Sequence, residues 1–286
     1  MKYIFIAAHS EEFGIQRMCG VLGVQRSGYY AWQKRKPSTR EQANLELLEL
    51  IEVEHKHSRE TYGSPRLHLA LQQKGVACGH NRVARLMRLH RIVALNKRKY
   101  HPVTTQRQPG VVPAPNLLNQ DFSASAPNQK WVVDFTFIAT EEGWLYLAVV
   151  LDLFSRRVVG WAMSQTMDTA LVESALRMAL DTRHPPAGLL HHSDQGSQYT
   201  SAAYRSCLET ALAQLSMSGA GNCYDNAVIE SFFATLKTEC VTGPFQTVAL
   251  ARTTIFEYIE VWYNRQRIHS TLGYHSPVDF EENFPL

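Results

Sequence analysis

The sequence predicts a mixed α/β domain preceded by a basic, all-helical region. Three segments between residues 131 and 163 have the β-branched and aromatic composition of strands, and helices and strands then alternate as far as residue 217. Residues 1–130 carry 20 Lys and Arg against 9 Asp and Glu, whereas the remainder carries 9 against 17. We therefore expect a helical region over 1–96, a basic and then Pro-rich linker over 97–128, and the α/β domain with a C-terminal helix over 129–286.

The helical region contains two predicted pairs of helices. Helical spacing of apolar residues favours helices over 12–22 and 25–32, separated by a glycine, and this helix-turn-helix outline offers Arg26 to a DNA groove. A longer helix over 41–57 precedes a second pair over 64–73 and 81–90, which exposes Arg82, Arg85 and Arg88. Helix pairs also occur in many helical domains that bind no DNA.

A long stretch without acidic residues favours DNA binding over an ordinary helical domain. Between Thr61 and Gln120 there are ten basic residues and no acidic one. A solvated basic surface is the ordinary explanation of a charge run, but this one favours a polyanion, and the helices favour double-stranded DNA. The linker over 97–128 has little room for a core, so it either follows a DNA backbone or serves as a passive tether.

The α/β domain begins with predicted strands over 131–139, 144–151 and 158–163, arranged as an antiparallel meander. Asp168 or Thr169 caps a helix that extends to residue 182. A strand over 189–192, a helix over 202–210, a strand over 213–217 and a helix beginning at Asp225 or Asn226 follow. An apolar and aromatic stripe between residues 255 and 263 predicts a final helix that packs back on the domain.

Three acidic residues are the candidate catalytic groups. Asp134 shares one strand face with Val132, Asp194 follows the strand over 189–192 at a turn containing glycine, and Glu230 lies on the following helix. Carboxylates gathered at one point repel one another unless a cation lies between them. Two Mg²⁺ or Mn²⁺ ions about 4 Å apart would suit such ligands and phosphodiester chemistry.

The spacing of the three acids and the sequence motifs around them resemble those of a known family. Thirty-five residues separate Asp194 from Glu230, as in the catalytic core of retroviral-type integrases and DDE transposases. The chain is most similar to the second-frame product of the IS-three family of bacterial insertion sequences. The matching segments are Trp131–Asp134, His192–Tyr199, Tyr224–Asn226, Glu230–Phe233, Leu236–Lys237 and Tyr263–Asn264, with Arg267, His269 and Leu272–Gly273.

This resemblance implies an RNase H-like fold and a transposase that cleaves and joins DNA at insertion-sequence ends. It also implies two-metal phosphoryl transfer, a homo-oligomer on DNA, and fusion or association with an upstream-frame product. The place of action would be the bacterial cytoplasm, at the nucleoid. Retroviral integrases carry an N-terminal zinc module of paired His and Cys, whereas His55 and His57 here have no CxxC partner, so the insertion-sequence branch is preferred.

The resemblance also assigns roles around the three acids. It places the catalytic acid at Asp134 and not at Asp152, which ends the second strand. It gives Glu230 the catalytic role, and we assign Asp225, the competing acid, to capping. Lys237 lies nearly two turns after Glu230, and the resemblance implies that it contacts the DNA end. From helical spacing, we expect Asn226, one turn before Glu230 on the same face, to support the site.

Composition bounds the remaining possibilities. Hydrophobic content of 45% and charged content of 19% are typical of a globular protein, and we expect neither a membrane span nor a signal peptide. Five scattered cysteines without a CxxC pair suit a reducing compartment. Two other functions stay open, a hydrolytic nuclease of the same fold and an inactive DNA-binding regulator of transposition.

Overall fold

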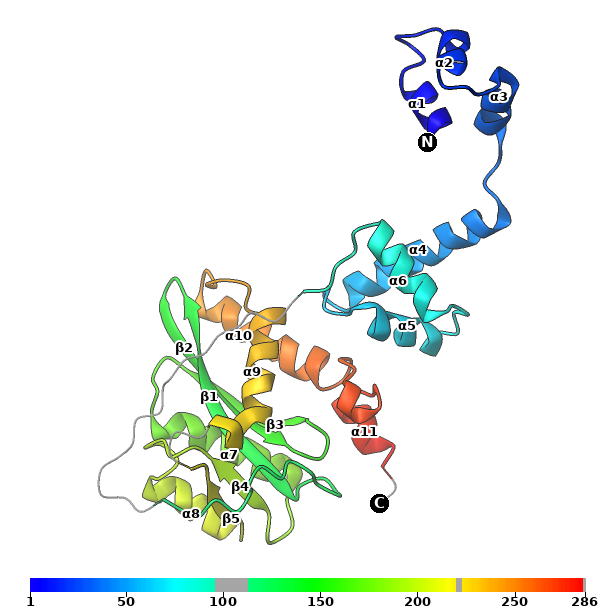
Figure 1. The fold of residues 1–286 in the computed structure, drawn as a ribbon. Coiled ribbons are helices and arrows are strands. Elements are labelled where there is room, and N and C mark those ends of the chain that lie inside the picture. Colours follow the sequence, from blue (N-terminus) through cyan, green and yellow to red (C-terminus); the bar gives the residue numbers. More distant parts are fainter. Residues whose placement is uncertain (96–112, 220–222, 285–286) are drawn as a thin grey trace.

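The computed structural model describes residues 1–95, 113–219 and 223–284. Figure 1 shows three parts in chain order, a small N-terminal group of helices, a second group of helices, and the α/β domain. The N-terminal group comprises α1 (Lys2–Ala8), α2 (Ile15–Val21) and α3 (Arg26–Lys34). Its own small core consists of Ile6, Met18, Cys19 and Tyr29. The helix-turn-helix outline of α2 and α3 is confirmed, whereas α1 was not predicted.

The second group comprises α4 (Thr39–His57), α5 (Ser64–Gln73) and α6 (His80–Leu89), as the sequence predicts. Ser38 and Glu41 form a capping box that fixes the start of α4, and Pro65 occupies the first turn of α5. The buried side chains of these helices join the same hydrophobic core as residues of the α/β domain. This helical group is therefore packed onto that domain.

The α/β domain is built on a five-stranded mixed sheet. Its strands are β1 (Lys130–Thr140), β2 (Gly143–Asp152), β3 (Val158–Ser164), β4 (Leu190–Ser193) and β5 (Gln214–Met217), in the spatial order β3-β2-β1-β4-β5. The first three form the predicted antiparallel meander, and β4 and β5 run parallel to β1. Together with the flanking helices, this topology is RNase H-like.

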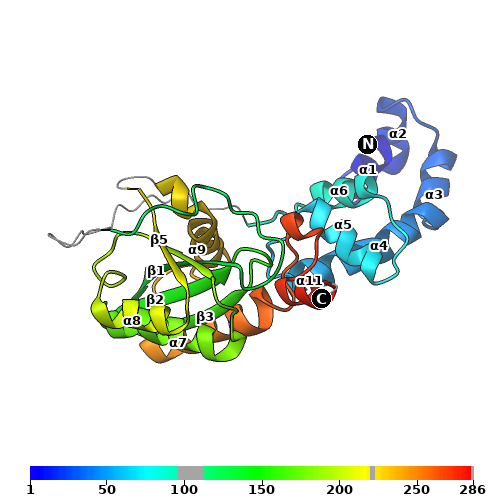
Figure 2. The same cartoon turned by 90° about the horizontal axis from the view of Figure 1, so that it is seen from below.

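Helices cover both faces of the sheet (Figures 1 and 2). One core contains residues of α7 (Thr169–Arg183) and α8 (Ala202–Thr210), and Asp168 caps α7 by accepting from Leu171 N at 3.1 Å. The other contains residues of α9 (Ala227–Glu239), α10 (Val248–Phe256) and the π-helical continuation Glu257–Tyr263. The chain ends on α11 (Pro277–Glu282), which was not predicted.

The segment before β1 is more than a tether where the structure describes it. Residues 96–112, which hold half of the expected linker and all of its basic residues, lie outside the described residues. Leu118 is only 1% exposed and belongs to the core of the domain, so the expectation of little core in this segment is wrong from residue 113 onward. The three segment boundaries themselves stay a prediction. Within the described ranges, no helix is long and apolar enough to cross a membrane.

Candidate active site

The strand register brings Asp134 and Asp194 to the same level of the sheet. Val132 of β1 pairs with His192 of β4 in a parallel ladder. Each aspartate lies two residues further along its own chain, so the two occupy equivalent positions on neighbouring segments and emerge on the same face. Val132 contributes to the core under α9, which identifies this face as the one that α9 covers.

The turn after β4 fixes the side chain of Asp194. Gly196 N donates a hydrogen bond of 2.9 Å to Asp194 Oδ1. A Cβ atom at position 196 would approach that oxygen to 2.9 Å, which is closer than real Cβ contacts allow. Gly196 is therefore a supporting residue of the site, and the Gly-containing turn was its signal in the sequence.

Glu230 reaches the site from the first turn of α9. Its neighbours Ile229 and Phe233 are buried in the core, which anchors this helix against β1. The Glu230 side chain itself is exposed at the edge of this contact. The helix thus holds a carboxylate beside the sheet position that Asp134 and Asp194 share.

The electrostatics show that the three acids interact. Burial raises the pKa of Asp134 well above its usual range, and the negative charges of Asp194 and Glu230 raise it further. A hydrogen bond of 2.8 Å from Phe135 N to Asp134 Oδ1 and the charge of Lys237 lower this pKa without cancelling the effect. The acids therefore form a site with excess negative charge.

Lys237 lies at the same site. Its ammonium group stands 4.8 Å from the ring centre of Phe137 on β1, and Lys237 and Asp134 influence each other's pKa. Burial lowers the pKa of Lys237, whereas Asp134 raises it. The structure thus brings together Asp134, Asp194, Glu230 and Lys237, as the sequence predicts, while the roles of these residues stay predictions.

A divalent cation suits this site in charge and in ligand type. Burial and the charges of Asp194 and Glu230 raise the pKa of Asp134, and a bound cation would relieve the repulsion between these charges. Carboxylate oxygens are the ligands that Mg²⁺ prefers. Across residues 1–95, 113–219 and 223–284, however, no three His, Cys, Asp or Glu side chains stand close enough to form a ready-made metal cluster. The residues fit the ion chemically, without a preformed cage.

The capping role expected of Asp225 is wrong. Asp225 lies in the 3₁₀ turn Cys223–Asn226, and Asn226 occupies the N-cap position of α9 without a side-chain capping bond. Asp225 is 1% exposed and accepts hydrogen bonds from Asn116, Gln120 and Gly219. Asn226 is 5% exposed, and its Oδ1 has no hydrogen-bond partner in the described part of the chain. Its supporting role stays a prediction.

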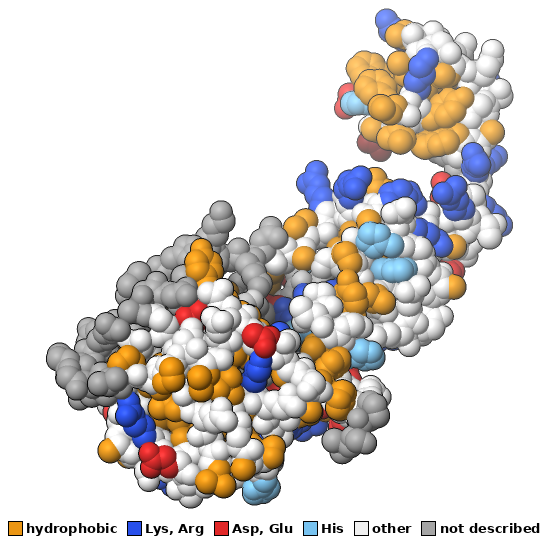
Figure 3. Space-filling view, turned by 60° about the horizontal axis from the view of Figure 1, so that its bottom comes forward, with side chains coloured by type: hydrophobic (Ala, Val, Ile, Leu, Met, Phe, Trp, Pro, Cys, Tyr) orange, Lys and Arg blue, Asp and Glu red, His pale blue; other side chains and the backbone are white. Residues whose placement is uncertain are grey.

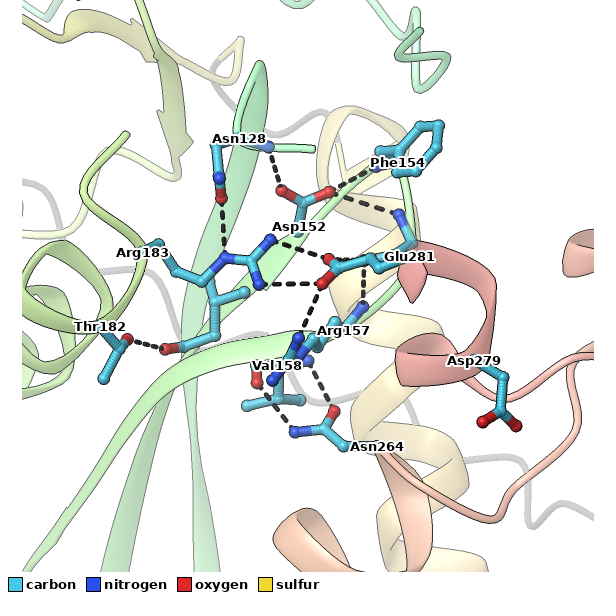
Figure 4. A network of polar contacts seen from close by, with 12 residues as sticks. Asn128, Asp152, Phe154, Arg157, Val158, Thr182, Arg183, Asn264, Asp279 and Glu281 are labelled. Carbon is cyan, nitrogen blue, oxygen red and sulfur yellow. Dashed lines mark hydrogen bonds and ion pairs between the residues drawn. The ribbon is translucent and has the colours of Figure 1, made fainter. Parts of the chain in front are cut away.

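Asp152, the alternative to Asp134 as the catalytic acid, forms hydrogen bonds that stabilise the fold. Its carboxylate accepts from Asn128 N at 2.6 Å, Trp131 Nε1 at 3.1 Å and Phe154 N at 2.8 Å. Figure 4 shows it near a second buried acid, Glu281 of α11. Glu281 receives two bonds from Arg183, of 2.8 and 2.9 Å, and it also pairs with Arg157 and Ser155. These acids hold the far end of β2 and α11 together.

The predicted DNA contacts lie on both helical groups. Figure 3 shows Lys and Arg side chains gathered along one edge of the α4–α6 group. Arg85 and Arg88 of α6 are exposed, as is Arg26 at the first residue of α3. Arg82 is half-buried because its Nε donates to Asn44 Oδ1 of α4 at 2.8 Å, so it also ties two helices together.

Family models match both the helical region and the α/β domain. Two family descriptions, each named integrase core domain, match residues 124–223 and 230–284, and an HTH-like domain matches residues 42–100. Among solved structures, a chain of the simian T-cell lymphotropic virus intasome in complex with PP2A regulatory subunit B56 gamma resembles this one with a TM-score of 0.48. That likeness has 15% identity and covers 83% of this chain and 76% of that chain.

Curated relatives are more similar and extend over almost the full length. The insertion element IS600 uncharacterized 31 kDa protein of Shigella sonnei is 48% identical, with 93% of this chain and 98% of that protein covered. Transposase InsF for insertion sequence IS3A of Escherichia coli (strain K12) is 46% identical, with 98% of both chains covered. The chain belongs to the family of IS3 insertion-sequence transposases that carry an integrase core domain.

Proposed function

We propose that this transposase cleaves and joins DNA at the ends of its insertion sequence, with Asp134, Asp194 and Glu230 as the catalytic acids. The observation that carries this assignment is the parallel register of β1 and β4, which places Asp134 beside Asp194, with Glu230 on α9 close enough for its charge to act on Asp134. Perturbed acids gathered beside a sheet are typical of a functional site. Family membership supports the reaction class, which is phosphoryl transfer on a polynucleotide.

The three carboxylates would hold divalent cations, Mg²⁺ or Mn²⁺, and two ions are expected. Bound there, such ions would increase the acidity of a water or a 3′-hydroxyl and stabilise the leaving oxygen of an in-line displacement. Asp134 of β1 and Asp194, directly after β4, would supply neighbouring ligands, and Glu230 would supply one from α9. Lys237, on the same helix and close to Asp134, would hold a phosphate of the DNA end next to the acids.

The partner is double-stranded DNA, comprising the insertion-sequence end and the target. Arg85 and Arg88 would contact phosphates, Arg82 would add its charge to the same face, and Arg26 would approach a groove from α3. We further propose that the chain acts as a homo-oligomer on DNA, alone or fused to an upstream-frame product. Such a protein would work at the bacterial nucleoid.

A strand-transfer assay tests this function and separates it from the alternatives. The parent chain is incubated with a labelled duplex carrying the insertion-sequence end and a target plasmid, with Mg²⁺, with Mn²⁺ or with excess EDTA. We expect cleaved and joined products with either ion and none with EDTA. Cleavage without joining would identify a nuclease, whereas DNA binding without cleavage would identify a regulator. Joining that persists in EDTA would overturn the metal assignment.

A further inference from the structure

The segment that precedes β1 contacts both β5 and the turn that starts α9. We call residues 113–121 the strap. Its backbone lies beside the edge strand β5, because Met217 N donates to Pro115 O at 3.3 Å. Leu117 N and Leu118 N both donate to Ser216 Oγ, at 2.9 and 3.2 Å. The strap thereby pairs one backbone N–H of the edge strand, that of Met217, and binds the side chain of Ser216.

Ser216 links the strap by hydrogen bonds to the segment that carries Asp194. Its hydroxyl oxygen already accepts two bonds from the strap, so its proton is directed to His192 Nδ1, 2.8 Å away. His192 Nδ1 is therefore the acceptor of this hydrogen bond. His192 lies two residues before Asp194 on β4.

Asp225 attaches the other side of the strap to the base of α9. Asn116 Nδ2 donates to Asp225 Oδ2 at 2.9 Å, and Gln120 Nε2 donates to Oδ1 at 3.0 Å. Gly219 N, on the loop after β5, donates to Oδ2 at 2.9 Å. One carboxylate that is 1% exposed thus joins the strap, the end of β5 and the turn that starts α9. All three donors are N–H groups, so both oxygens of this carboxylate act as acceptors.

The conformation of the strap indicates that these contacts determine it. Asn119 has φ of 46° and Gln120 has φ of 60°, in the left-handed region that residues other than glycine rarely adopt. Such backbone persists where the surrounding contacts over-determine it. For Gln120, the side chain that reaches Asp225 belongs to the same residue that carries the unusual φ.

We propose that Asp225 is a positioning residue for the reaction, which pins the strap to the start of α9 and so sets Glu230 against Asp134 and Asp194. Glu230 lies five residues after Asp225, on the helix that begins directly behind the pinned turn. The strap holds the Asp194 segment through Ser216 and His192, and the Glu230 helix through Asp225. This inference rests on the proposed function, because it assigns a role in the same reaction.

The test combines amide hydrogen exchange with strand-transfer kinetics on the full chain. Asp225→Asn keeps the size of the side chain but replaces an accepting oxygen with a donor that faces donors. Gln120→Asn tolerates the left-handed backbone, yet its amide is one methylene too short to reach Asp225. Asp181→Asn, at an exposed position of α7, is the matched control. Exchange is followed at the amides of Leu117, Leu118 and the first turn of α9.

We expect Asp225→Asn to speed exchange in the strap and the first turn of α9 at least tenfold, with β1 and β2 unaffected. Its kcat for joining should fall at least tenfold while KM for the DNA end stays within twofold. Gln120→Asn should also speed exchange and lower kcat, each by a smaller factor. If Asp225→Asn does not fold, the result with Gln120→Asn tests the proposal. The Asp181→Asn protein should match the parent.

Three results would overturn the proposal. The first is parental exchange and turnover in Asp225→Asn. The second is faster exchange of the strap with parental kcat, which would leave Asp225 a structural role only. The third is a lower kcat with parental exchange, which would mean that Asp225 acts without the strap. A parent chain that fails to join DNA would remove the proposed function, and the exchange data would still show whether the strap is pinned.

Discussion

The α1–α3 and α4–α6 groups look alike in the sequence, but only the second shares a hydrophobic core with the α/β domain. The α1–α3 group has a core of only four buried side chains, and it leaves Phe5 and Phe13 about half exposed. The α4–α6 group shares one continuous core with the α/β domain, in which Leu47 and Ile51 lie with Ile259 and Ile268. A helix pair that shares a core has its position fixed by packing, whereas one with its own small core folds as a separate unit.

The junction of α4–α6 with the α/β domain is connected by contacts to α9, the helix that carries Glu230. Ile268 N donates to Tyr62 Oη at 2.8 Å, and Arg59 pairs with Glu257 at 3.0 Å. Next to Ile268, the buried guanidinium of Arg267 forms bonds of 2.7 to 3.1 Å with both carboxylate oxygens of Glu239, the last residue of α9. The basic surface of α6 is therefore held in a defined position relative to Glu230, through contiguous contacts.

The largest expected loss of stability follows from a substitution that disrupts this junction. Tyr62→Ala removes a ring that is 3% exposed and leaves the Ile268 amide without its acceptor. We expect the free energy of unfolding of the joined α4–α6 and α/β unit to fall by roughly 3–5 kcal/mol. Urea unfolding followed by tryptophan fluorescence measures it. Tyr30→Ala, at an exposed position of α3, should leave that transition in place; equal losses in both variants would contradict a shared core.

A smaller loss of folding stability is expected at acidic pH, and it arises in the α/β domain. Burial lowers the pKa of His191 on β4 from 6.5 to about 3, so the unfolded chain binds the proton more readily than the folded one. Stability is then fully present above about pH 6.5 and falls as the pH decreases towards 3. At pH 5 the loss is roughly 2 kcal/mol from this residue.

Thermal unfolding of the parent and of His191→Gln at pH 7 and pH 5 measures this dependence. Gln keeps a donor and an acceptor for the Tyr204 hydroxyl, which lies 2.9 Å from His191 Nε2, but it does not titrate. The variant should therefore lose less stability than the parent between the two pH values. Identical losses would show that His191 does not contribute.

The basic surface should show its effect in the salt dependence of DNA binding. Arg85→Ala with Arg88→Ala should reduce the slope of log affinity against log salt by about 0.9 for each phosphate that the protein no longer neutralises. Arg82→Ala should instead cost about 1 kcal/mol of stability, because its bond to Asn44 is removed, with a smaller change in slope. Fluorescence anisotropy at several salt concentrations measures binding, with exposed Arg177→Ala of α7 as control. An unchanged slope in the double variant would assign these arginines to ordinary surface.

The smallest effect on the main unfolding transition should come from the N-terminal group. Tyr29→Ala removes a ring that is 1% exposed from the small N-terminal core. We expect α1–α3 to unfold while the main thermal transition stays within about 1 °C of the parent, because no shared core connects the two. Proteolysis between α3 and α4 should become faster in this variant. A main transition lowered as much as by Tyr62→Ala would show that the two helical groups are coupled.

Local patterns predicted most of the fold and the positions of the acids. Alternation along β1 placed Asp134 on the same face as Val132, and the Asp168 cap followed from its position before an apolar helix. The strap could not be predicted, because its Pro- and Asn-rich composition is typical of a loop. Its attachments to Ser216 and Asp225 join residues about a hundred positions apart. Asp225 was assigned to capping for the same reason, since a local pattern carries no information on distant donors.

Glu230 is the residue on which the proposed reaction depends most, and one variant tests it directly. Glu230→Gln keeps size and helix propensity but removes the charge that a divalent cation needs. On a labelled insertion-sequence end with Mg²⁺, it should bind DNA and melt like the parent, while joining falls by more than about 100-fold. Exposed Glu209→Gln of α8 should join at the parental rate. Near-parental joining by Glu230→Gln would contradict the catalytic triad.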